Sequence, residues 1–167
     1  MKALSLWQPW ASLVIIGAKQ WETRSWSTPY RGMLAIHAAK RWTADEKEQC
    51  LEPGFREALR PFHATLGDIP RGAVLGIVRL VEIVSTNLIL FESERHHMKP
   101  HLEKVTRIFP EQEKQFGNYA SNRYAWRLEV VERFANPVPA KGMQSIFEWD
   151  PPTPAEAQDK TREAGNG

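Results

Sequence analysis

Residues 2–26, KALSLWQPWASLVIIGAKQWETRSW, predict a strand, a helix and a second strand in close succession. Residues 2–7 are mostly apolar and form a run short enough for a strand. Pro9 suits the first turn of a helix, and apolar side chains continue at near-helical spacing until Gly17. In residues 21–26 aromatic and charged side chains alternate, as they do in a strand with two different faces. We therefore expect two short strands to flank one short helix.

The rest of the chain combines further strand patterns with helical insertions. Strands are expected at residues 32–40, 72–84 and 123–135 and just before residue 149, and helical segments at 43–62, interrupted at Pro53-Gly54, and at 99–116, split at Pro110. Thr43 and Glu46 have the spacing of a capping box. Strands at both ends enclose helices without regular strand–helix alternation. This order predicts an α+β fold, a small mixed β-barrel with flanking and inserted helices.

Length and composition indicate a single globular domain over residues 1–149, followed by a polar tail. The tail, residues 150–167, is rich in proline and charge and contains no aromatic residue. The longest apolar runs are far shorter than the roughly 20 residues that cross a membrane, and Gln8 and Pro9 interrupt any signal-peptide core. The single cysteine, Cys50, excludes an internal disulfide and favours a reducing compartment, so we expect a cytoplasmic protein with no membrane partner.

Positive charge and tryptophan are concentrated near the N-terminus. Residues 1–41 contain six Lys or Arg and one Glu, a net charge of +5, whereas the whole chain carries +2. They also contain four of the seven tryptophans. Cations that neutralise phosphate and aromatic rings that stack on bases are typical of RNA-binding surfaces. The alternative is that the tryptophans fill the core and the cations are solvated.

The segment GAKQWETR, residues 17–24, contains the strongest candidate for chemistry. Lys19 follows a predicted helix end, where the dipole favours a cation. A partly desolvated lysine beside Glu22 can act in proton transfer, and Arg24 offers a planar fork for phosphate or a base edge. The alternative is a surface ion-pair ladder worth less than about 1 kcal/mol.

The histidines and the single cysteine are weaker candidates for catalytic or binding residues than Lys19, Glu22 and Arg24. If the strands at 21–26 and 32–40 pair as a hairpin, His37 approaches Glu22 and Arg24; otherwise it is a structural residue. Three further histidines, His96, His97 and His101, do not predict a metal site, because Pro100 interrupts the helix that their spacing requires.

We expect a polar loop around these histidines and neither a metal nor a cofactor. Acidic neighbours would raise the pKa of the Cys50 thiol, so we do not consider it a nucleophile.

The same segment resembles the opening of an ASCH domain. The family signature G-x-K-x-x-E-x-R is matched by Gly17, Lys19, Glu22 and Arg24. Further similar segments are QPW at 8–10, RGMLAIHAAK at 31–40, RYAW at 123–126 and PVPAKG at 137–142, so the resemblance spans roughly residues 2–149.

The resemblance implies a PUA-like fold, a small β-barrel whose cleft binds RNA or a nucleotide. Some members are amidohydrolases that remove the acetyl group from 4-acetylcytidine, and others are similar to ribonucleases or to coregulators. This sequence differs from the amidohydrolases, because Glu22 stands where they have a threonine nucleophile. The second carboxylate of those members has two candidates here, Glu82 and Glu92.

Two functions therefore remain open, a hydrolase acting on an acylated nucleoside or RNA, and a non-catalytic reader or regulatory adaptor. In the hydrolase, Lys19 positions the substrate carbonyl or phosphate and Glu22 is the base toward water. In either case the partner is RNA or a modified nucleoside. The predicted binding residues are Arg24 and Lys40 for phosphate, Trp10 or Tyr124 for base stacking, Gln8 for a base edge, His37 beside the cluster and Lys141 for a backbone contact.

Overall fold

The computed structural model describes residues 1–97 and 107–152. The strands in this part are β1 (Lys2–Leu6), β2 (Trp21–Arg24), β3 (Gly32–Ala38), β4 (Ala73–Ser85), β5 (Ile89–Phe91), β6 (Arg107–Phe109), β7 (Tyr124–Pro139) and β8 (Ile146–Glu148). The α-helices are α1 (Trp10–Ile15), α2 (Ala44–Leu51), α3 (Pro53–Leu59) and α4 (Glu111–Lys114), and three short 3₁₀ helices are η1 (Leu66–Asp68), η2 (Thr86–Leu88) and η3 (Glu92–His97). In this part of the chain no helix is long and apolar enough to span a membrane.

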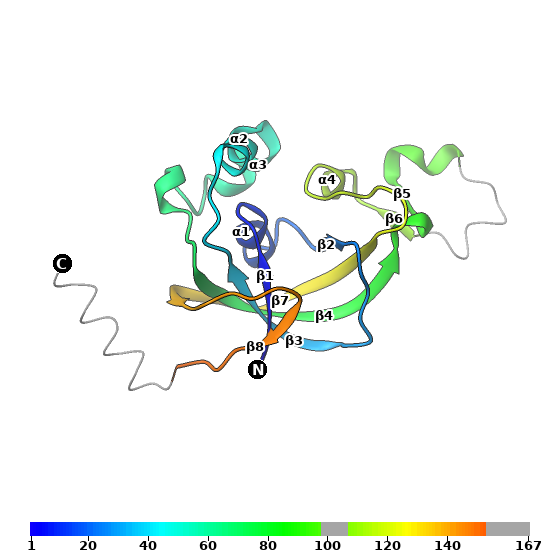
Figure 1. Ribbon diagram of the computed structural model, residues 1–167. Helices are drawn as coiled ribbons and strands as arrows, with labels where there is room; N and C mark the ends of the chain where they lie inside the picture. Colours follow the sequence, from blue (N-terminus) through cyan, green and yellow to red (C-terminus); the bar gives the residue numbers. More distant parts are fainter. Residues whose placement is uncertain (98–106, 153–167) are drawn as a thin grey trace.

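Six strands form one mixed sheet in the order β2-β7-β4-β3-β1-β8. The pair β1 and β3 is parallel, and the other neighbouring pairs are antiparallel. The sheet curves into a half-barrel with α1 on its concave side, and α2, α3 and α4 lie beyond α1 on that side (Figure 1). This arrangement confirms the predicted α+β, PUA-like fold.

Close packing of backbones allows the two longest strands to bend together. The register of β4 against β7 shifts at three places, one of them between Val74 and Gly76. A Cβ atom at Gly76 would lie under 3.0 Å from the carbonyl oxygen of Glu132 on β7. Bulges of this kind increase local bend and twist, so they contribute to the curvature that the sheet needs.

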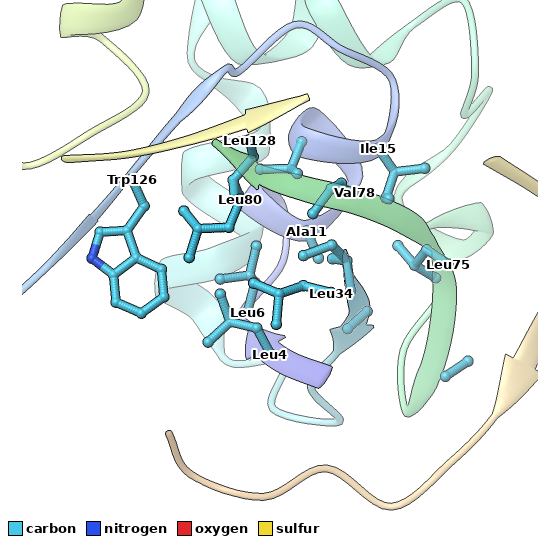
Figure 2. Close-up of a cluster of buried hydrophobic side chains, with 14 residues drawn as sticks. Leu4, Leu6, Ala11, Ile15, Leu34, Leu75, Val78, Leu80, Trp126 and Leu128 are labelled. Carbon is cyan, nitrogen blue, oxygen red and sulfur yellow. The ribbon is translucent and has the colours of Figure 1, made fainter. Parts of the chain in front are cut away.

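The main core lies between α1 and the concave face of the sheet. Ala11 and Ile15 of α1 point toward leucines of β1, β3 and β4, and Trp126 of β7 closes one side (Figure 2). The opposite side of α1 is buried as well, because Leu13 packs in a second cluster with Phe55 of α3. A helix of six residues is therefore covered on both sides. Each fully buried large side chain contributes roughly 1.5–3 kcal/mol of transfer free energy.

The predicted interruption and capping box in the first helical insertion are confirmed. Pro53 begins α3 directly after α2, and the Glu46 carboxylate accepts hydrogen bonds from the Thr43 N–H (2.7 Å) and from its hydroxyl. Burial on its own would raise the pKa of Glu46. Hydrogen bonds from Thr43 and Arg41 outweigh that effect and lower this pKa to about 2.

Two expectations about secondary structure are wrong in whole or in part. The helical segment predicted at 99–116 and split at Pro110 is confirmed after Pro110, where α4 begins, but residues 107–109 are a strand. There β6 pairs in parallel with β5, and Phe109 stacks on Trp21 with ring centroids 4.2 Å apart. This packing against a distant tryptophan outweighs the local helical pattern. Residues 99–106 lie outside the described residues, as do His101 and most of the predicted tail. His96 and His97 belong to η3 rather than to a loop.

Of the two arrangements left open for residues 21–26 and 32–40, the hairpin does not form. β2 pairs with β7, with Glu22 opposite Trp126, whereas β3 lies between β1 and β4. Both hydrogen-bonding edges of β3 are therefore occupied, and none remains for β2.

Candidate functional site

Lys19, Glu22 and Arg24 form a chain of charges at the junction of α1 and β2. Gly17 ends the helix with a positive φ of 79°, and the backbone N–H of Lys19 donates to the Leu13 carbonyl at 3.0 Å. The Lys19 Nζ lies 3.7 Å from Glu22 Oε2, and Arg24 Nε lies 3.2 Å from Glu22 Oε1. One carboxylate therefore contacts two cations.

The three charged groups differ sharply in access. The side chain of Lys19 has no exposed surface, whereas those of Glu22 and Arg24 are 12% and 24% exposed. Burial lowers the pKa of Lys19, and the nearby carboxylates of Glu22 and Glu113 counteract part of that shift. Lys19 also donates a hydrogen bond to the Trp21 carbonyl. The Lys19 ammonium group is therefore enclosed between the Glu22 carboxylate and the Trp21 carbonyl.

A second carboxylate does approach this cluster, and it is Glu113 of α4. Its Oε1 accepts from the Gln20 N–H at 2.6 Å and its Oε2 from the Trp21 N–H at 3.3 Å. Burial raises the pKa of Glu113. In sequence, Glu113 is one of several charged residues after Pro110, so no local signal distinguishes it.

The two carboxylates considered from the sequence lie elsewhere. Glu82 of β4 pairs with Arg127 at 3.6 Å, and Glu92 is exposed at the start of η3.

A first cavity, of about 560 Å³, opens above Glu22 and Arg24. Two tryptophans line it, Trp7 just after β1 and Trp10 at the start of α1. Gln49 of α2 and Phe55 of α3 line one side, and this gives the inserted helices a role that the sequence did not reveal. The lining continues after α4 with Gln115, Phe116 and Asn118, and with Arg123. Phe116 contacts Phe55 with ring centroids 5.0 Å apart, so α3 and the segment after α4 meet at this cavity.

A second cavity, of about 1100 Å³, adjoins the first. The two share Ser5, Trp7 and Arg24. Lys40 and Lys141 also line the second cavity, and no Asp or Glu is among its lining residues. It is therefore a basic cavity, whereas the first one combines a carboxylate, amides and arginines.

His37 contributes to the second cavity as a neutral structural group. Its Nε2 lies 3.1 Å from the Ala140 carbonyl oxygen, so this nitrogen is the donor, and Nδ1 accepts from the Ser5 hydroxyl at 3.1 Å. Burial lowers the pKa of His37, although the Ala140 contact opposes the shift. Because Gly142 also packs against the ring, His37 positions the loop that carries Lys141.

Two predicted binding residues do not line either cavity. Gln8 is fully buried, and its amide donates to the Pro70 carbonyl (2.6 Å) and accepts from the Ser12 N–H (3.1 Å). Tyr124 lies opposite Arg24 in the sheet but packs against the main core.

Trp7 is a residue that the sequence reasoning missed. Its side chain is 52% exposed, and the Arg41 guanidinium lies 4.3 Å from the ring centroid. Strand alternation contained a usable signal, because Trp7 follows the buried Leu6 and so points the other way. Within residues 1–97 and 107–152, no group of three or more His, Cys, Asp or Glu side chains is placed to hold a metal ion.

Comparison with known proteins gives the same family as the signature. Activating signal cointegrator 1 of Homo sapiens and that of Mus musculus are each 38% identical to this chain over 82 residues, which is 49% of the chain and 14% of those longer proteins. The solved ASCH structure from Zymomonas mobilis is 15% identical with a TM-score of 0.45, covering 96% of this chain and 93% of that one. A solved mutant of the same Zymomonas mobilis protein gives 14% and 0.43, with 97% and 94% covered. The family model named ASCH domain matches residues 4–138, and the chain therefore belongs to the ASCH domain family.

Proposed function

We propose that this ASCH domain is a reader that binds a nucleobase of RNA, or a modified nucleoside, in the first cavity without turning it over. The observation that carries the proposal is the arrangement of Lys19 and Glu22. The lysine is completely buried, and the partly exposed carboxylate already contacts two cations. Such a carboxylate is fixed in place as a hydrogen-bond acceptor.

The chemistry of the cavity suits a base. Glu22 would accept from the exocyclic amino group of cytosine, adenine or guanine, or from the imino N–H of guanine or uracil. Gln49 adds a side-chain amide with both a donor and an acceptor. Trp10 offers a ring for stacking, which is worth about 1–3 kcal/mol per base.

Hydrolysis is the competing function, and the geometry supports it less. A lysine that positions a substrate carbonyl has to reach the cavity, and Lys19 has no exposed surface. A general base has to lie within hydrogen-bond reach of the attacking water. Glu22 has access to the cavity, but its two oxygens are oriented by Lys19 and Arg24.

The test combines affinity and product analysis on the same purified protein. Cytidine, guanosine and 4-acetylcytidine are titrated by calorimetry, and each mixture is then examined by mass spectrometry. We expect binding without products, and Glu22→Gln to weaken the preferred nucleoside about tenfold, since one charged acceptor is lost. Gln49→Ala should weaken it by a smaller factor.

The matched control is Glu82→Gln, which removes an equal charge on β4 outside both cavities and should leave the affinity unchanged. Products from the wild type that disappear in Glu22→Gln, with affinity retained, would establish the hydrolase instead. If no nucleoside, acylated or not, binds at all, the reader function is wrong.

A further inference from the structure

We infer that the ligand is a single-stranded oligonucleotide that occupies both cavities, with one base in the first cavity and the adjoining phosphate and nucleotide in the second. This inference rests on the proposed function and decides between the two ligand classes named there. Its basis is that the cavities are neighbours with a common wall, made of Ser5, Trp7 and Arg24. A ligand bound in one cavity can therefore continue into the other past Arg24.

The charge of the second cavity matches a phosphodiester and not a nucleoside. Arg24, Lys40 and Lys141 line it without any acidic side chain. A free nucleoside is neutral and leaves such a set of cations unused. Arg24 Nη2 donates to the Ser5 carbonyl at 2.8 Å and its Nε pairs with Glu22, so a phosphate next to the bound base would contact the remaining N–H groups of Arg24 and chiefly the two lysines.

The lysines are held near the cavity by the fold. The stem of Lys40 crosses Gly72, where a Cβ atom would lie 2.7 Å from its Cγ and where the backbone has a positive φ of 65°. Lys141 follows directly after Ala140, whose carbonyl accepts from His37. The contact along Gly72 restricts the Lys40 stem and so reduces the conformational entropy that its binding would otherwise cost, whereas for Lys141 the fold fixes the backbone position.

Size and aromatic surface also fit a second nucleotide. The second cavity is about twice as large as the first, 1100 against 560 Å³. Trp7 stands at the common wall, and Arg41 holds its ring by lying 4.3 Å from the centroid. Arg41 is itself paired with Glu46, so Trp7 is a supported platform on which the neighbouring base can stack. Trp26 lines the second cavity farther on.

A length series tests this inference. The probes are cytidine, the dinucleotide CpC and the tetranucleotides rC4 and dC4, titrated by fluorescence or calorimetry at several salt concentrations. We expect affinity to rise at least tenfold from cytidine to rC4. With about three phosphate contacts, log K for rC4 should fall against log salt with a slope of about −2. Stronger binding of rC4 or of dC4 identifies the preferred sugar, and either result supports the two-cavity site.

Variants separate this inference from the proposed function. Lys40→Ala and Lys141→Ala should each weaken rC4 several-fold and flatten the salt slope, while cytidine affinity stays the same. Lys2→Ala is the matched control, because it removes one cation that is paired with Glu148 outside both cavities. If rC4 binds no tighter than cytidine and ignores both lysine variants, the two-cavity site is wrong and the nucleoside reader stands. If Glu22→Gln leaves every probe unaffected, the first-cavity function itself is wrong.

Discussion

Glu46 shows how one buried carboxylate connects local folding to the candidate site. It caps α2 through Thr43, and it also accepts a hydrogen bond from Arg41, the residue that stacks on Trp7. A surface carboxylate would contribute little, but this one is only 2% exposed. Its ionised form is therefore part of the folded state and couples stability to pH.

The prediction for Glu46 follows from the direction of its shift. Its pKa is about 2 when folded against 4.5 when unfolded, so the unfolded chain binds the proton more tightly. The resulting stability is complete above about pH 4.5 and is lost as the pH falls toward 2. Glu46→Gln should lower the free energy of unfolding at pH 6 by on the order of 2 kcal/mol and reduce the loss between pH 4.5 and 3.

Urea titrations of both proteins at pH 6, 4 and 3 measure this difference. Asp45→Asn is the control, because Asp45 is a highly exposed neighbour whose pair with Arg41 spans 3.9 Å. A Glu46→Gln variant that keeps the full wild-type slope between pH 4.5 and 3 would show that this carboxylate is not the source of the coupling.

Among the elements, the pairing of β4 with β7 determines the curvature of the sheet. Gly76 lies where the register shifts, and β7 passes directly over it. We predict that Gly76→Ala lowers the free energy of unfolding by about 2 kcal/mol or more, because the added methyl group meets backbone atoms that cannot rotate away. Thermal unfolding followed by circular dichroism measures the change.

Gly67 provides the comparison within the same chain. A Cβ atom there would contact only the Thr65 hydroxyl, at an ordinary 3.4 Å. Gly67→Ala should therefore change stability by less than about 0.5 kcal/mol. If Gly76→Ala and Gly67→Ala changed the free energy of unfolding equally, the close approach of the β7 backbone would not explain the glycine at position 76.

The sequence predicted correctly those helices and strands that are determined by residues close to one another in the chain. Alternation in residues 21–24 and the glycine at position 17 identified β2 and the end of α1, and the Thr43–Glu46 spacing identified the start of α2. The failures share a different cause. β6 is a strand because Phe109 meets Trp21, and β2 pairs with β7 because β3 has no free edge. Such long-range contacts leave no periodic signal near the residues concerned.

The candidate site likewise contains residues that the sequence predicted and one that it did not. The signature residues Glu22 and Arg24 do line a cavity, and Lys40 and Lys141 line its neighbour. Glu113 was not foreseen, because its contact with the backbone of Gln20 joins segments 93 residues apart. Whether these side chains bind a ligand stays a prediction.

At the scale of the whole molecule, the two ends of the described domain are joined. The Trp149 N–H donates to the Met1 carbonyl at 2.7 Å, and Trp149 packs with Phe147 and Ala3 on the outer face of the sheet. We predict that Trp149→Ala lowers the free energy of unfolding by about 3 kcal/mol or more, as expected for truncation of a buried aromatic ring.

The neighbouring Glu148→Ala is the control. Glu148 is exposed and pairs with Lys2 and with the N-terminal amino group, so its loss should affect stability much less than the loss of Trp149. Chemical denaturation of the two variants shows whether apolar packing or charge holds the two ends of the described domain together. A larger effect of Glu148→Ala would favour charge.

The strand order also has a consequence for synthesis on the ribosome. β1 begins at Lys2, yet one of its two neighbours, β8, begins only at Ile146. At a translation rate of about 5–20 residues per second, that side of β1 has no partner for on the order of ten seconds after β1 is made. β2 waits almost as long for β7, because Trp21 pairs with Arg127. The edge of β4 that faces β7 is open over the same interval. The nascent chain therefore carries several open strand edges, all of them targets for chaperones, until nearly the whole domain has been translated.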